Sequence, residues 1–167
     1  MEEESVKYSL DLHNRRWQAS FLPAHAEAEV ASQLVNPLRV ITSGALEIGE
    51  VPFFAMGQWR MANRSKWWDT YDDETPVVIG HFWRRFNVAT KRVSGVFGKD
   101  VFEGIGSHEW LGKRQNVYCV DYSVGQRHAE RTRDSGIDEY HGKLAALRYP
   151  EWQVYHDDGT IVPINVV

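Results

Sequence analysis

The sequence predicts an α+β domain in which helices come early and a mostly antiparallel sheet comes late. Residues 25–35 are good helix formers and end at Asn36-Pro37. Short β-branched runs at 76–79 and 116–124 are typical of buried strands. Asp157-Asp158-Gly159 is a hairpin signal between two further runs. Helices followed by consecutive strands favour the α+β class.

The first half of the chain is predicted to hold a second helix and a short strand. Residues 38–41 contain the β-branched pair Val40-Ile41, and Ser43-Gly44 would close them as a short strand. The stretch 58–71 is predicted to be a helix. An acidic turn over 69–76 then leads into the second half.

The second half is predicted to be mainly strands and loops. Val77 to Ile79 is a strand that ends abruptly in Gly80-His81, and the glycine-rich, charged stretch 84–115 is a loop. Residues 126–142 are polar and are predicted to be exposed. Further strands are expected at 144–149, 152–155 and 160–162, with Pro150 as a bulge between the first two.

Composition bounds the class of protein. The 167 residues suit one domain or a large piece of one, and 43% apolar with 25% charged residues is ordinary for a globular protein. A net charge of −4 gives no general attraction to nucleic acid or to an anionic membrane. The seven tryptophans indicate either a core of large aromatics or an exposed aromatic surface that awaits a partner.

Localisation is predicted to be cytoplasmic. The single Cys119 excludes an internal disulfide and fits a reducing compartment. No segment approaches the roughly 18 consecutive apolar residues of a membrane helix. The acidic start, Met1 to Ser5, has no apolar stretch behind it and is not a secretory signal.

The Gly80-His81 pair is the strongest candidate site in the sequence. A short strand that ends here would place the imidazole at the edge of the sheet, where a ligand can reach it. Gly80 lets the backbone approach a bound ion or phosphate, and His81 can bind a metal through a neutral ring nitrogen. The alternative is a hydrogen-bonded core histidine beside Phe82 and Trp83.

Several blocks, in order, resemble bacterial calcineurin-like metallophosphatases. The matching blocks are Trp67-Trp68, Pro76 to Arg84 (which contains Gly-His-Phe-Trp-Arg), Asn116 to Gly125 and Lys143 to Glu151. The resemblance is to the branch near the bis(5′-nucleosyl)-tetraphosphatases and the PPP-type serine/threonine phosphatases. It covers about residues 40–155, so the chain is divided here into a poorly matched segment, 1–40, and a metallophosphatase-like region, 41–167.

The resemblance implies a fold and a chemistry. It implies the C-terminal part of an αββα sandwich and hydrolysis of a phosphoester by a hydroxide between two divalent ions of the manganese, iron or zinc class. His81 would be a ligand of the second ion. Arg84 would contact a phosphate oxygen, although a surface arginine is an equal alternative.

Most metal-ligand motifs of that family are missing from this chain. Asp11-Leu12-His13 has the Asp-x-His spacing but lacks the preceding strand and glycine turn. Gly106-Ser107-His108-Glu109 resembles Gly-Asn-His-Glu, but it has Ser for the ligating Asn and follows His81 instead of preceding it. Two ions about 3.5–4 Å apart need carboxylates for neutralisation. His81 alone therefore cannot hold the pair.

The sequence also predicts where Asp121, two tryptophans and three arginines lie. Asp121, inside an apolar strand, is expected to orient a neighbouring site residue or to pair with a buried donor. Trp67 and Trp68 are expected in the core, with a stacking platform for a nucleobase as the alternative. The arginines of the polar segment are expected on a solvated face; they are Arg127, Arg131 and Arg133.

Three functional hypotheses remain from the sequence. The first is an incomplete phosphoesterase that needs an N-terminal phosphatase half, or self-association through an apolar face. The second is a non-catalytic nucleotide- or phosphate-binding module, or an interaction subunit, derived from a phosphatase. The third is an enzyme with a different site, built from His81 with His108, His128 or His141.

Overall fold

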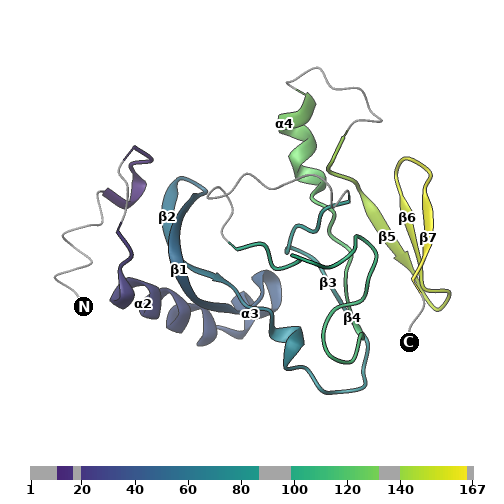
Figure 1. Cartoon of the computed structure of the whole chain (residues 1–167), viewed down its shortest axis with the longest axis horizontal. Helices are drawn as coiled ribbons and strands as arrows, with labels where there is room; N and C mark the ends of the chain where they lie inside the picture. The colour runs from purple at the N-terminus through teal and green to yellow at the C-terminus, as the bar shows by residue number, and fades with distance from the viewer. Residues whose placement is uncertain (1–10, 17–19, 87–98, 132–139, 165–167) are drawn as a thin grey trace. The chain divides into compact units, whose positions relative to one another are not determined.

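The computed structural model describes residues 11–16, 20–86, 99–131 and 140–164 (Figure 1). Packing divides the chain into two compact units. Unit 1 comprises Met1–Ser65 and Arg92–Val101, and unit 2 comprises Lys66–Lys91 and Phe102–Val167. The predicted boundary at residue 40 was drawn from the resemblance and stays a prediction.

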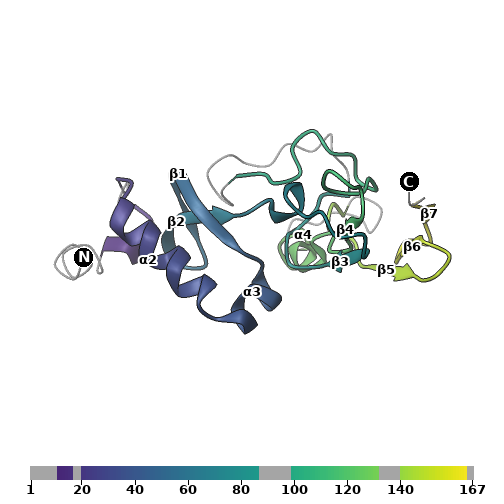
Figure 2. The same cartoon turned by 90° about the horizontal axis from the view of Figure 1, so that it is seen from below.

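Unit 1 is a β-hairpin with a helix packed against it. The hairpin consists of β1 (Leu46–Ala55) and β2 (Gln58–Arg64), which are antiparallel, and α2 (Pro23–Leu34) contacts both strands. Figure 2 shows α2 lying along the hairpin, with α3 (Pro37–Ser43) following it. The core of unit 1 is a small apolar cluster made up of Leu12, Leu22, Ala26 and Met61.

The predicted helix at 58–71 is wrong. Residues 58–64 form β2, and only Trp67–Asp69 makes a short 3₁₀ turn. A two-residue turn at Met56 and Gly57, both with positive φ (50° and 79°), reverses the chain so that β2 pairs with β1. Cross-strand pairing thus overrides the helix propensity of the local sequence.

The predicted strand at 38–41 is also wrong, because these residues belong to α3. The side chain of Asn36 accepts hydrogen bonds from the backbone N–H groups of Leu38 and Arg39, and Pro37 occupies the first helical turn. Asn36-Pro37 therefore does end one helix, as predicted, but it also begins the next.

Unit 2 contains two small sheets. In one, β3 (Val77–Ile79) runs parallel to β4 (Val117–Cys119). The other is antiparallel and consists of β5 (Ala145–Arg148), β6 (Gln153–His156) and β7 (Ile161–Pro163). The core of unit 2 is aromatic and aliphatic; its buried members are Trp110, Tyr118, Tyr122, Val154 and Ile164.

The predicted α+β class, with early helices and mostly antiparallel strands late, is confirmed. The hairpin signal at 157–159 joins β6 to β7, and β3 and β4 lie within the predicted runs. Pro150 lies in the turn between β5 and β6, which corrects the predicted bulge. Among the residues that the structure describes, no helix is long and apolar enough to cross a bilayer.

The stretch 126–142 corrects a further prediction. It was expected to be exposed, but its described part includes α4 (Arg127–Arg131), in which the side chain of Glu130 is buried. Arg127 is also only partly exposed, because it pairs with Asp157. Arg131 is exposed as expected. Arg133 lies outside the described residues.

Candidate functional site

The parallel pair β3–β4 brings two polar segments to one sheet edge. Val77 pairs with Val117 and Ile79 with Cys119, so the two strands end side by side. Gly80 and His81 follow β3, and Asp121 lies two residues after the end of β4. The carboxyl ends of parallel strands are a common location for ligand sites. We refer to Gly80, His81 and Asp121 as the strand-end site.

Asp121 fixes the backbone of this site. Its Oδ2 atom accepts a hydrogen bond from the His81 N–H at 2.9 Å, and its Oδ1 atom accepts one from the Ser123 N–H, also at 2.9 Å. Its carbonyl oxygen accepts from the Arg84 N–H at 2.8 Å. Asp121 was predicted to orient a neighbouring site residue or to pair with a buried donor; the structure shows that it holds the backbone of His81, and the role of His81 in a site stays a prediction.

His81 presents its ring at the surface. Its φ of 67° is in the left-handed region, which histidine visits more readily than most side chains. The residue is exposed, and its ring lies edge-on to Trp83 with the centroids 5.8 Å apart. The structure therefore favours the accessible histidine of the two alternatives over the buried one. Such strained backbone is often found at functional sites.

The donor set around His81 does not fit a metal pair by itself. In the described ranges, no group of three or more His, Cys, Asp and Glu side chains gathers closely enough to hold an ion. Both oxygens of the Asp121 carboxylate already accept backbone hydrogen bonds. Two divalent ions need several carboxylates, and this edge of unit 2 does not supply them.

Arg84 lies inside unit 2 and is only 1% exposed. Its guanidinium lies between the rings of Tyr118 and Phe102, at 5.2 and 5.6 Å from their centroids. Its Nη2 atom donates to the carbonyl oxygens of Gly106 and Glu109, each at 2.5 Å. Nε and Nη1 are buried and have no hydrogen-bond partner in the described part of the chain. The predicted phosphate contact would need one of these two nitrogens, and it stays a prediction.

The segment Gly106 to Glu109, rejected as a metal motif, has a structural role as a turn. Its carbonyls hold Arg84, as described above. The backbone carbonyl of Ser107 accepts a hydrogen bond of 2.8 Å from the Tyr122 hydroxyl, which in turn lies 2.6 Å from the Tyr118 hydroxyl. Burial raises the pKa of both phenols, so they are neutral hydrogen-bonding groups.

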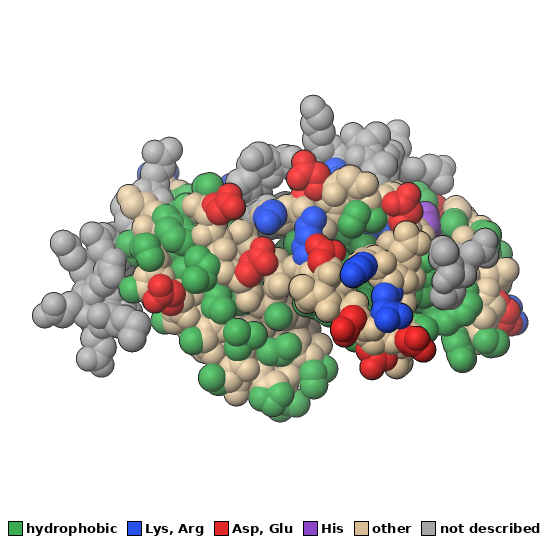
Figure 3. All heavy atoms as spheres, turned by 60° about the horizontal axis from the view of Figure 1, so that its bottom comes forward, with side chains coloured by type: hydrophobic (Ala, Val, Ile, Leu, Met, Phe, Trp, Pro, Cys, Tyr) green, Lys and Arg blue, Asp and Glu red, His purple; other side chains and the backbone are tan. Residues whose placement is uncertain are grey.

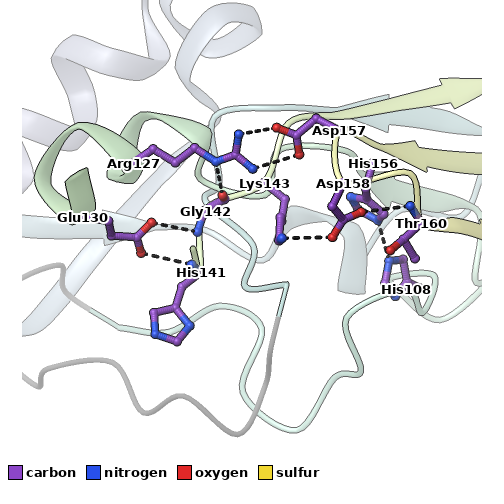
Figure 4. A network of polar contacts seen from close by, with 10 residues as sticks. All are labelled: His108, Arg127, Glu130, His141, Gly142, Lys143, His156, Asp157, Asp158 and Thr160. Carbon is purple, nitrogen blue, oxygen red and sulfur yellow. Dashed lines mark hydrogen bonds and ion pairs between the residues drawn. The ribbon is translucent and has the colours of Figure 1, made fainter. Parts of the chain in front are cut away.

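A polar network surrounds the start of β5 and the β6–β7 hairpin (Figure 4). Lys143, only 4% exposed, forms an ion pair with Asp158 at 2.9 Å. Arg127 forms a bidentate pair with Asp157 and donates to the Gly142 carbonyl oxygen. These two ion pairs fasten the hairpin turn at 157–158 to the segment that leads into β5.

The carboxylates of Asp157 and Asp158 stay ionised because their hydrogen bonds lower the pKa of each group. The hydrogen bond from Lys143 lowers the pKa of Asp158, and the backbone N–H of Thr160 adds to the effect. Burial alone would raise the pKa of Asp157, but the hydrogen bond and charge of Arg127 outweigh it and lower the pKa.

Glu130 anchors the other side of the network. Its carboxylate accepts hydrogen bonds from the backbone N–H groups of His141 and Gly142, at 3.2 and 3.4 Å, and from the Gln126 side chain at 3.0 Å. It is 6% exposed. Figure 4 shows Glu130 reaching from α4 to the chain just before β5.

The structure pairs two histidines that the sequence did not connect. The Nε2 atoms of His108 and His156 lie 2.8 Å apart. The third sequence hypothesis grouped His81 with His108, His128 or His141; it stays a prediction. His156, Lys143 and Glu130 carried no local signal, because their partners are distant in sequence.

Comparison of the chain with models of protein families, with curated proteins and with solved structures finds no match.

Proposed function

We propose that this chain is the C-terminal portion of a metal-dependent phosphoesterase, acting on a phosphoprotein or a nucleotide, and that it is incomplete alone. The observation that carries the proposal is the strand-end site: an exposed His81, directly after a parallel strand, with its backbone held by the carboxylate of Asp121. In this proposal His81 supplies one metal ligand, and other polypeptide supplies the carboxylates that the described donor set lacks.

The geometry gives each part of the strand-end site a definite task. The Asp121 carboxylate holds the backbone N–H of His81, which keeps the imidazole at the sheet edge. A Cβ built on Gly80 would make an ordinary van der Waals contact with the Cβ of Asp121, at 3.9 Å, so the described residues would accommodate a small side chain there. A metal pair at this edge would polarise a phosphoester and activate water. The chain's own contribution is to hold one imidazole in place.

The test is reconstitution with the N-terminal half of a calcineurin-like phosphatase that carries the Asp-x-His and Gly-Asn-His motifs. The chain alone is expected to bind Mn²⁺ or Zn²⁺ weakly and to leave p-nitrophenyl phosphate intact. Adding the half in trans is expected to tighten Mn²⁺ binding about tenfold or more, corresponding to about 1.4 kcal/mol, and to produce hydrolysis.

Matched variants test whether His81 is a metal ligand. His81→Ala is expected to abolish both gains, whereas His128→Ala, at an exposed histidine of α4, is expected to keep them. If the chain alone binds two ions tightly, its ligand set is complete and the claim that it is incomplete is wrong. Gains that survive His81→Ala, or no gain with any such half, would refute the proposal itself.

A second candidate, an interaction subunit derived from a phosphatase, is favoured by the surface of unit 1. The end of α2 and the length of α3 expose large apolar side chains, with exposed fractions between 53% and 80%; they are Leu34, Val35, Leu38 and Ile41. Hydrophobic side chains gather in several groups on the face in Figure 3. Such a surface is typical of protein contacts.

A binding experiment separates this candidate from the first. An interaction subunit is expected to retain its partner after His81→Ala and to lose it when Leu38 and Ile41 are replaced by Gln. A pull-down with the same N-terminal half measures both. Retention in both variants would exclude contact through α3.

A further inference from the structure

The half-buried His108 and the buried His156 form an imidazole pair in unit 2. His108 lies in the turn 106–109, and His156 is the last residue of β6. Their Nε2 atoms are 2.8 Å apart, and the two rings, which Figure 4 draws in contact, are edge-on at an interplanar angle of 80°. This hydrogen bond requires one ring to donate an N–H and the other to offer a lone pair, so it cannot form when both rings are protonated.

The surroundings of the pair are apolar and aromatic. The ring of Phe86 lies 4.8 Å from that of His156 and 5.9 Å from that of His108, and the ring of Tyr122 lies 4.9 and 5.4 Å from them. His156 is 5% exposed, and its Nδ1 atom has no hydrogen-bond partner in the described part of the chain. A proton gained here would create a poorly solvated cation.

The charged groups that face the pair act on a further proton in both directions. Arg84 faces His108, and Lys143 faces His156; both are cations. Asp157 and Asp158 favour the charged form of His156, but they are already paired with Arg127 and Lys143. The remaining neighbours, the hydroxyls of Tyr118 and Tyr122 and the thiol of Cys119, are neutral because burial raises each pKa.

Burial is the main cause of the shift of both rings. It lowers the pKa of His108 from 6.5 to about 4, with the charges of His156 and Arg84 adding to the effect, and it lowers the pKa of His156 as well. In the unfolded chain the rings would titrate near 6.5. Between pH 6.5 and 4 the unfolded state therefore binds more protons, so acidification through this window reduces the stability of unit 2.

The pair connects two parts of unit 2 that are distant in sequence. The turn 106–109 supplies the two carbonyl acceptors of Arg84, and the Ser107 hydroxyl donates to the Phe86 carbonyl at 2.6 Å. At the other end, the His156 N–H donates to Thr160 and closes the β6–β7 hairpin. If the contact between the two rings is lost, the turn 106–109, which holds Arg84, is no longer fastened to the end of β6.

We propose that the His108–His156 pair is an acid-sensitive latch that fastens the turn 106–109 to the end of β6 at neutral pH and releases it on acidification. A first extra proton places a cation where burial against the rings of Phe86 and Tyr122 disfavours charge. A second proton sets two N–H cations against each other. The latch is a property of unit 2 that does not depend on the proposed phosphoesterase function.

Hydrogen exchange tests whether the turn 106–109 separates from the end of β6. The exchange of the full chain is measured by mass spectrometry at pH 7.5 and pH 5.0 and is corrected for intrinsic rates. Peptides over 102–116 and 153–163 are expected to lose protection together at pH 5.0. Peptides over β1 and β2, in unit 1, are expected to keep theirs and serve as the internal control. Unchanged protection of both latch peptides at pH 5.0 would overturn the proposal.

Substitutions test whether the loss of stability in acid comes from the His108–His156 pair. A ring with a pKa of about 4 in the folded state and 6.5 in the unfolded state lowers the folding equilibrium constant about tenfold between pH 7.5 and 5.5. His108→Gln keeps a hydrogen-bonding side chain without a titratable ring and is expected to remove most of this decrease. His128→Gln, at an exposed histidine, is expected to keep it, and an equal decrease in both variants would contradict the latch.

A spectroscopic measurement on the unmodified protein covers the case in which His108→Gln does not fold. The Cε1 proton shifts of the histidine rings report each titration by NMR. Of the seven rings, His108 is expected to titrate with a pKa of about 4, and the pKa of His156 is expected to lie below the ordinary histidine value of 6.5. Titration of every ring near pH 6.5 would exclude the latch without any substitution.

Discussion

Unit 1 and unit 2 differ in what they bury. Among the described residues, the buried polar side chains of unit 1 are the amides Gln33 and Asn63, and its core is an aliphatic cluster. Unit 2 buries four ionisable side chains besides its aromatic core: Arg84, Glu130, Lys143 and His156. Both units leave some large apolar side chains exposed, and those of unit 1 include Leu34 on α2 and Leu38 and Ile41 on α3.

The difference shows two ways in which a small unit holds together. Apolar burial is insensitive to pH and tolerates substitutions of similar volume. Buried charged groups stabilise only while every partner is present, because a lone buried charge costs several kcal/mol. We therefore expect unit 2 to respond to acid and to loss of single partners, and unit 1 to respond mainly to loss of volume.

The largest effect is expected from Trp68→Ala in unit 2. Trp68 is 1% exposed and its ring packs on those of Phe82 and Phe102, at 5.2 and 6.0 Å. Removing a buried tryptophan costs about 3–5 kcal/mol of unfolding free energy. Urea denaturation measures the change. Trp68→Phe should cost much less, since it keeps an aromatic ring and removes an indole N–H that has no partner among the described residues.

Met61→Ala is expected to have the next largest effect, and it sharpens the contrast between the units. Met61 is fully buried in the cluster of unit 1. Its loss should lower the unfolding free energy by about 2–4 kcal/mol, and Met61→Leu by less than about 1.5 kcal/mol. The loss should be the same at pH 7.5 and pH 5.5, because no titratable group is removed. A strongly pH-dependent loss would contradict the distinction between the units.

Sequence patterns predicted the elements whose signals are local. β3 is a β-branched run between Pro76 and Gly80, and the 157–159 turn has the Asp-Asp-Gly signature. Helix α2 follows from its alanine-rich composition. In each case the residues that decide the conformation lie within the element or directly beside it, so no knowledge of distant partners is needed.

The incorrect predictions concern elements that are decided elsewhere. β2 has the composition of a helix, and it becomes a strand because the turn at Met56-Gly57 lays it against β1. Asn36 was interpreted only as a stop signal, although its side chain also caps α3. A pattern that can end one helix and begin another needs the cap geometry to be resolved.

The candidate site shows the same division between local and distant information. Asp121 was predicted to serve a neighbouring site residue, because a carboxylate in an apolar strand needs a donor, and the donor is the His81 N–H. The His108–His156 pair gave no signal, since the rings are 48 positions apart in sequence. Local patterns identify polar residues that need partners, but they do not identify the partner.

Glu29→Gln tests the main ion pair of unit 1 and is expected to have a smaller effect. Glu29 Oε1 lies 3.1 Å from Arg60 Nη1, and Oε2 accepts from the Met61 N–H at 3.3 Å. Because the pair is partly exposed, neutralising Glu29 should cost only about 1 kcal/mol of unfolding free energy. Glu27→Gln, at an exposed position of the same helix, should cost less than about 0.5 kcal/mol. Equal costs would mean that the pair contributes nothing specific.

Ile41→Gln is expected to have the smallest effect on stability and the clearest effect on the surface of unit 1. Ile41 is 80% exposed on α3, and glutamine is at least as good a helix former as isoleucine, so the unfolding free energy should change by less than about 0.5 kcal/mol. Binding of a hydrophobic dye, or self-association measured by sedimentation, should nevertheless decrease, because the apolar surface becomes smaller.

Val51→Gln on β1, 71% exposed, is the matched control. If both variants reduce dye binding equally, the apolar surface of unit 1 is general and not concentrated on α3. If neither does, that surface is not what the dye or a second copy binds, and the contrast with unit 2 rests on buried charge alone.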